Sequence, residues 1–145
     1  MEKLLQYINN VRPLTSLKAL DTFSRAGEWA TYRFASMVKT LECWEYDSQH
    51  IERLKRNFPN AIVRQVDSIQ QMQQHSQRYD FVFIDNPQGL YCDNKYCEHF
   101  EILGHIHRVV TDHCFVIFNC NNKPYVNPEK PIEYYNKWIE RRNIF

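Results

Sequence analysis

Glycine is scarce in this sequence of 145 residues, which contains only Gly27, Gly89 and Gly104. Three glycines so far apart cannot form a glycine-rich phosphate-binding loop of the standard kind. No stretch approaches the roughly 18 consecutive apolar residues that a membrane-spanning helix requires. Residues 1–11 alternate polar and apolar side chains and lack the continuous apolar segment of a secretory signal peptide. We therefore expect a cytoplasmic protein without a membrane segment.

The sequence also lacks a large net charge of either sign. Eighteen Lys and Arg residues balance seventeen Asp and Glu residues, for a formal charge of +1. This balance argues against a basic footprint for nucleic acid over the whole domain and leaves room only for a local patch. The five cysteines are an odd number without an export signal, which favours reduced thiols. The length predicts a single domain over residues 1–145.

Hydrophobic periodicity predicts five strands that alternate with helices. The expected strands cover residues 17–21, 41–45, 61–66, 79–84 and 114–118. The expected helices cover residues 3–11, 28–38, 48–58, 68–75, 95–110 and 132–142. This alternation is typical of an α/β fold, with a mostly parallel sheet of about five strands and helices on both faces. In such sheets ligands bind at the carboxyl ends of the strands.

An acidic residue ends or closely follows each of the first four expected strands: Asp21, Glu45, Asp67 and Asp85. Aspartate is a common turn and helix-cap residue, so each acid alone has a structural explanation. Four in succession favour a ligand site. An acid at the end of the second strand is placed to accept hydrogen bonds from a ribose diol.

Residues 20–27, Leu-Asp-Thr-Phe-Ser-Arg-Ala-Gly, resemble motif I of the class I S-adenosylmethionine-dependent methyltransferases. Residues 44–47, 66–68 and 83–88 resemble later motifs of the same family, in the right order. The form of motif I is similar to that of enzymes that methylate amino groups of nucleic-acid bases. The resemblance covers about residues 14–120. It implies a Rossmann-like methyltransferase core with an extra N-terminal helix and a truncated C-terminal end, without the family's sixth and seventh strands.

The resemblance also implies a cofactor, S-adenosylmethionine, and roles for particular residues. The implied cofactor-binding residues are Asp21, Phe23, Arg25, Gly27, Glu45 and Asp67. Glu45 would accept hydrogen bonds from the ribose hydroxyls, and Asp67 would contact the adenine amine. The implied catalytic residues are those of motif IV, Asp85, Asn86 and Pro87, which would accept hydrogen bonds from the target amine.

Two departures from the family's motifs leave two functions open. Motif I keeps only Gly27, because Phe23 and Arg25 stand where the family has its earlier glycines. Arg25 would either pair with the carboxylate of the cofactor or obstruct the pocket. Motif IV has Asn86 and Gln88 in place of its second proline and its aromatic residue. The first hypothesis is methyl transfer to an amino group, on a nucleic-acid base. The second is a methyltransferase-like fold that has lost catalysis and serves as a binding or scaffold protein.

The remaining patterns give weaker predictions. Cys92 and Cys97 have a spacing that fits a zinc pair poorly, so we expect no metal site. The apolar strand at 114–118 has no proline or lysine to protect it at the edge of the sheet. Pairing of two such edges about a two-fold axis predicts a homodimer, unless another segment of the chain covers the edge.

Overall fold

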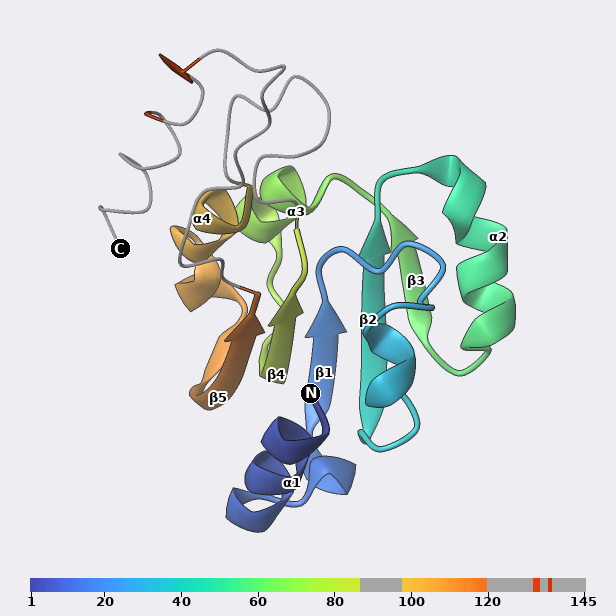
Figure 1. The fold of residues 1–145 in the computed structure, drawn as a ribbon, viewed down its shortest axis with the longest axis vertical. Coiled ribbons are helices and arrows are strands. Elements are labelled where there is room, and N and C mark those ends of the chain that lie inside the picture. Colours follow the sequence, from blue (N-terminus) through green and yellow to red (C-terminus); the bar gives the residue numbers. More distant parts are fainter. Residues whose placement is uncertain (87–97, 120–131, 134–135, 137–145) are drawn as a thin grey trace.

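A five-stranded parallel sheet forms the centre of the protein (Figure 1). The computed structural model describes residues 1–86, 98–119, 132–133 and 136. The strands are β1 (Lys18–Asp21), β2 (Thr40–Glu45), β3 (Ile62–Gln65), β4 (Tyr79–Ile84) and β5 (Val110–Phe118). Their order across the sheet is β3-β2-β1-β4-β5, and every described pairing is parallel. The order reverses between β1 and β4, which is where α/β sheets bind ligands.

Helices cover both faces of the sheet, as the strand–helix alternation predicts. They are α1 (Glu2–Val11), α2 (Ser48–Asn57), α3 (Ser68–Gln74) and α4 (Glu98–Leu103). Leu5 and Ile8 of α1 and Leu54 of α2 pack in one apolar cluster, on one face. Met72 of α3 and Ile102 of α4 pack in a second cluster, on the other face. No helix among the described residues is long and apolar enough to cross a membrane.

The extra N-terminal helix is present and lies near the amino end of β1 (Figure 1). Its apolar stripe is buried through Leu5 and Ile8. Just beyond its end, Arg12 donates to Asp80 of β4 at 3.0 Å. The second Asp80 oxygen accepts the backbone N–H of Lys18 at 3.1 Å. Asp80 therefore joins the N-terminal segment and the start of β1 to β4, and these contacts lower the pKa of its carboxyl group despite partial burial.

The helix expected over residues 28–38 is not formed. The segment contains one short 3-10 helix, Thr31–Arg33, between turns. The ring of Phe34 is fully buried and lies 5.0 and 5.7 Å from the rings of Phe81 and Phe83. The hydroxyl of Thr31 donates to Asp21 at 2.6 Å. Long-range packing and this hydrogen bond therefore fix the segment, and they outweigh its helical periodicity.

The last third of the chain differs from its expected boundaries in three places. Helix α4 ends at Leu103, before Gly104, and a separate 3-10 helix covers Ile106–Arg108, so the long helix over 95–110 is wrong. Strand β5 begins at Val110, four residues earlier than expected. Of the helix expected over 132–142, residues 132, 133 and 136 are described and helical, and its other residues lie outside the described part.

Candidate functional site at the carboxyl edge of the sheet

The four acids that the sequence places after strands lie at one edge of the sheet, because β1 to β4 are parallel. Asp21 and Glu45 are the last residues of β1 and β2. Asp67 follows β3 by two residues, and Asp85 directly follows β4. The sequence therefore predicts correctly which edge these carboxylates share. Their individual environments differ.

Asp21 is buried beneath the loop that follows β1. One of its carboxylate oxygens accepts the hydroxyl of Thr31, and the other accepts the backbone N–H of Phe23 at 3.1 Å. Burial raises the pKa of Asp21 to about 7, and the charge of Asp85 adds to the shift, while the two hydrogen bonds oppose it. Asp21 is thus a carboxyl group that can exchange a proton near neutral pH.

Glu45 binds two backbone N–H groups of the chain itself. Its Oε2 accepts the N–H of Arg25 at 2.7 Å, and its Oε1 accepts the N–H of Asp47 at 2.7 Å. The residue is only 3% exposed. Each carboxylate oxygen has a second lone pair, so a hydroxyl donor could still be accepted. In the described structure, Glu45 fixes the positions of the loops that follow β1 and β2.

The loop after β1 uses the left-handed backbone region twice, at Arg25 (φ 49°) and Gly27 (φ 78°). A Cβ at Gly27 would overlap the ring of Phe58, so the glycine is needed for packing as well as for its φ. The guanidinium of Arg25 lies 5.8 Å from the centre of the Trp29 ring, and Trp29 is 69% exposed. Phe23, which stands where the resemblance implies a glycine, donates its N–H to Asp21.

Asp67 and Asn86 both contact the start of α3. Asp67 caps this helix, because its side chain accepts the N–H of Gln70 at 3.0 Å. The buried amide of Asn86 accepts the hydroxyl of Thr22 at 2.7 Å and donates to the hydroxyl of Ser68 at 2.8 Å. Asn86 therefore ties the end of β4 to the loop after β1 and to α3. Both ends of its amide are engaged within the chain.

Asp85, the acid of the segment that resembles motif IV, is half-buried. Burial raises the pKa of its carboxyl group above the ordinary value, and the charge of Arg25 partly offsets this effect. The amide of Asn119, just beyond β5, donates to Asp85. Asp85 therefore interacts with Arg25 of the loop after β1 and with Asn119, which follows β5. Pro87, the third catalytic residue implied by the resemblance, lies outside the described residues.

Several residues that hold this edge together were not predicted from the sequence. Thr22, Thr31, Ser68 and Asn119 hold the site acids and Asn86, while Phe58 occupies the space beside Gly27. Thr22, Ser68 and Asn119 follow strand ends, and the first two fall in segments that resemble motifs, whereas nothing in the sequence singles out Thr31. In the described part of the chain, no group of three or more His, Cys, Asp or Glu residues could hold a metal ion. Cys92 and Cys97 lie outside that part.

Comparison with known proteins identifies the type of fold. No protein-family model matches the chain, and no curated protein matches its sequence. Among solved structures, a TehB-like SAM-dependent methyltransferase from Corynebacterium glutamicum is similar, with a TM-score of 0.61 and 16% identity over 94% of this chain and 70% of that one. A putative RNA methyltransferase from Pyrococcus horikoshii has a TM-score of 0.61 and 17% identity, over 83% of this chain and 60% of that one.

A third similar structure is a complex of DhpI with SAH. Its TM-score is 0.56 at 18% identity, over 70% of this chain and 47% of that one. The chain thus spans between about half and seven tenths of the length of these three proteins. Together with the strand order, these likenesses identify the α/β architecture as the Rossmann-like methyltransferase fold, as the motifs of the sequence predict.

Proposed function

We propose that this protein is an S-adenosylmethionine-dependent methyltransferase whose cofactor lies over the carboxyl ends of β1, β2 and β3. The observation that carries the proposal is the clustering of Asp21, Glu45, Asp67 and Asp85 at one edge of a sheet with the methyltransferase strand order. The similar structures support it, because one of them is a complex with SAH.

The donor and acceptor groups at this edge are of the types that the hydroxyl, amine and carboxylate groups of the cofactor require. Glu45 keeps free lone pairs for the ribose hydroxyls beside the two N–H groups that it already accepts. Asp67 is partly exposed at the start of α3, where it could accept the adenine amine. Arg25 supplies a positive charge for the cofactor's carboxylate, and its charge already acts on Asp85. These residues would hold the cofactor.

The chain's contribution to methyl transfer would be to position an amine. When bound, S-adenosylmethionine supplies a methyl group that its sulfonium has already activated. The carboxylate of Asp85 would accept an N–H of the target amine and direct the nitrogen lone pair toward the methyl group. The raised pKa of Asp85 also suits it to take up the proton that the amine releases. Asn86 would act as a positioning residue, because its buried hydrogen bonds to Thr22 and Ser68 fix the end of β4.

An amino group of a nucleic-acid base is the acceptor that we propose. Two exposed aromatic residues in the segment after β1 each lie beside an arginine: Trp29 beside Arg25, and Tyr32 beside Arg33 at 5.0 Å. Exposed aromatic rings next to positive charges are the groups that single-stranded nucleic acids stack on. They would form the local patch that the near-neutral net charge still permits.

Calorimetry with S-adenosylmethionine and with its demethylated product tests the cofactor. We expect saturable binding of both by the wild-type protein, and its absence at millimolar ligand would overturn the proposal. Transfer of a labelled methyl group to total RNA or to DNA then tests the acceptor. Asp85→Asn should abolish transfer while cofactor binding remains, and the exposed control Glu52→Gln should change neither.

A second candidate function, a binding or scaffold protein without catalysis, has one specific observation in its favour. The polar residues of the edge already form hydrogen bonds within the chain and so stabilise the fold; they are Asp21, Glu45, Asp67 and Asn86. A cofactor that binds without detectable methyl transfer to any acceptor would favour this function. Transfer that depends on Asp85 would exclude it.

We also propose that the protein is a cytoplasmic homodimer joined through β5. This strand pairs with β4 along one edge, and no strand among the described residues pairs with its other edge. Two copies related by a two-fold axis would pair these edges with each other.

A further inference from the structure

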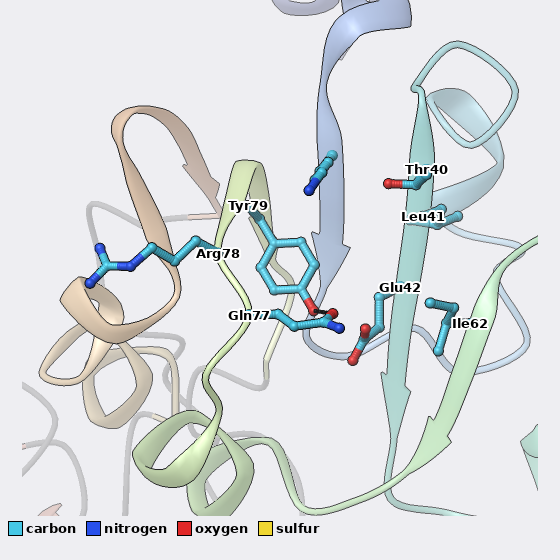
Figure 2. A pocket seen from close by; sticks show the side chains of 8 residues that line it. Thr40, Leu41, Glu42, Ile62, Gln77, Arg78 and Tyr79 are labelled. Carbon is cyan, nitrogen blue, oxygen red and sulfur yellow. Dashed lines mark hydrogen bonds between the residues drawn. The ribbon is translucent and has the colours of Figure 1, made fainter.

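A cavity of about 370 Å³ lies at the amino ends of the strands, away from the edge that carries the four acids. Its walls include Lys18, Thr40, Glu42, Ile62, Gln77 and Tyr79. Figure 2 shows the side chains of Glu42, Gln77 and Tyr79 converging from β2, from the segment before β4 and from the start of β4. Glu42 precedes Glu45 by three residues, which is about 10 Å along a strand.

The shortness of α3 leaves this part of the sheet open. Helix α3 begins at the carboxyl edge, after β3, and has seven residues, which is a length of about 10 Å. Strand β2 has six residues and extends for about 20 Å. The helix therefore covers the half of this face near the carboxyl edge, and the half near Glu42 is left to side chains from the strands and from residues 75–78.

Glu42 is a buried carboxylate with one unpartnered oxygen. Its Oε1 accepts the indole N–H of Trp44 at 2.8 Å and the Nε–H of Arg64 at 2.6 Å. No described residue donates a hydrogen bond to its Oε2, although the side chain is only 2% exposed. A buried acceptor without a donor costs free energy, and a ligand that supplies the donor recovers it.

The hydrogen bonds of the neighbouring side chains explain why Oε2 of Glu42 has no donor. The side-chain amide of Gln71 donates to Nδ1 of His75, so Nε2 of the neutral ring carries the proton and donates to the Tyr79 hydroxyl at 2.8 Å. Burial lowers the pKa of His75 and keeps the ring neutral. The single hydroxyl proton of Tyr79 is directed to Oε1 of Gln77 at 3.3 Å. Tyr79 and His75 also lie near Glu42, with Nε2 of His75 at 3.9 Å from Oε1, but neither is within hydrogen-bond distance of Oε2.

The charges and walls of the cavity define the class of ligand. Arg64 already neutralises Glu42, and Lys18 lines the same cavity, so a cationic ligand would meet excess positive charge. The ring of Tyr79 and the side chain of Ile62 give an apolar surface, while Thr40 and Gln77 offer further polar groups. A volume of about 370 Å³ is at the small end of the range for ligand sites.

We propose that this cavity binds a neutral heterocyclic amine of one or two rings, whose ring packs on Tyr79 and Ile62 and whose exocyclic N–H group donates to Oε2 of Glu42 after the carboxylate, which is buried in the free protein, turns toward the cavity. This site is separate from the proposed cofactor site and does not depend on it. Its chemical preference is for an amine over a carbonyl at the ring position that faces Glu42.

The variant Glu42→Gln tests this preference by reversing it. Trp44 and Arg64 both donate to the Oε1 position, so the amide oxygen of the glutamine must occupy that place. The amide NH₂ then takes the place of Oε2 and presents donors to the cavity. The probes are adenine and hypoxanthine, in which a carbonyl oxygen replaces the exocyclic amine. Affinities are measured by titration followed by NMR, with S-adenosylhomocysteine present to fill the carboxyl-edge site.

We expect the wild-type protein to bind adenine about tenfold or more tightly than hypoxanthine, and Glu42→Gln to prefer hypoxanthine. Glu52→Gln, on the exposed side of α2, should behave as the wild type. Amide shifts in the wild-type protein should change at residues 40–42 and 62, which keeps the proposal testable if the variant unfolds. Binding of neither base, shift changes confined to the carboxyl edge, or an unaltered preference in Glu42→Gln would overturn it. The last result would show that only water or the Tyr79 hydroxyl satisfies Glu42.

Discussion

The backbone N–H of Arg25 donates to Oε2 of Glu45 across 2.7 Å, and Arg25 adopts a left-handed φ of 49°. A carboxylate from β2 thus holds the loop after β1 in a conformation that non-glycine residues rarely adopt. The family resemblance implies a glycine near this position. Here an acid from the neighbouring strand provides the stabilisation that an arginine in the left-handed region requires.

Replacement of Glu45 should therefore affect stability and binding together. Glu45→Ala leaves the N–H groups of Arg25 and Asp47 without their acceptor, and we expect a loss of about 2–3 kcal/mol in the free energy of unfolding. Glu45→Gln keeps one acceptor and should cost less. Cofactor affinity should fall roughly ten- to a hundredfold in Glu45→Ala. Urea unfolding and calorimetry measure the two effects, and wild-type affinity in the alanine variant would remove Glu45 from the cofactor site.

Arg25→Gly separates the backbone of this loop from its charge. Glycine adopts the left-handed region at little cost, so the variant should be more stable by up to about 1 kcal/mol. Its affinity for S-adenosylmethionine should fall, because the positive charge near Asp85 is lost. A gain in affinity would instead show that the arginine obstructs the pocket. Unchanged affinity would place its side chain outside the site altogether.

The raised pKa of Asp21 predicts a pH dependence of stability. Its pKa is raised from an ordinary value of 3.8 to about 7 in the folded protein. Between these values the folded protein binds more protons than the unfolded chain, so the Asp21 contribution to stability falls as pH rises from about 4 to about 7. Asp21→Asn removes this contribution and can keep the contacts to Phe23 and Thr31. Urea unfolding from pH 5 to 8 should show the variant gaining stability relative to the wild type, and a constant difference would contradict the prediction.

Gly27→Ala should be strongly destabilising. The new Cβ would overlap the ring of Phe58, and alanine is strained at a φ of 78°. Strain and overpacking together should cost about 2–4 kcal/mol in the free energy of unfolding. Phe58→Leu in the same protein should recover part of this loss, because it frees space beside position 27. Urea unfolding of both single variants and the double variant measures the coupling, and strict additivity would show that backbone strain alone is responsible.

The proposed dimer predicts a mass near 35 kDa by sedimentation, about twice the 17.6 kDa of one chain. Amide exchange along β5 should slow as the protein concentration rises, because pairing of the two edges protects outward-facing N–H groups. Exchange along β1, which lies inside the sheet between β2 and β4, is the internal control and should not change. A monomer at all micromolar concentrations would refute the dimer.

The sequence predicts the sheet and its acidic edge well, because both depend on local patterns. Each strand contains a short apolar stretch, and the acids stand directly at or after the strand ends. The five strands lie close to their expected positions. The fully buried run of β4 shows why, since a strand covered on both faces needs apolar residues throughout.

The partners of these acids could not be predicted, because they come from distant parts of the chain. Thr31 binds Asp21 from ten residues away, and Thr22 reaches Asn86 across 64 residues. The unpartnered oxygen of Glu42 depends on a chain of hydrogen bonds through His75 that no spacing rule encodes. The absent helix at 28–38 has the same cause, because the burial of Phe34 between β-strand rings is a tertiary contact.

That missing helix has a consequence for how the protein opens. Residues 22–39 link β1 to β2 with only a 3-10 turn of regular structure, so contacts with other parts of the chain hold them in place, among them the buried ring of Phe34, the Thr31–Asp21 bond and the bond from Arg25 to Glu45. A segment that is held by such contacts opens locally when they are lost. Opening that exposes the Asp21 carboxyl group would therefore become more frequent as pH rises toward 7.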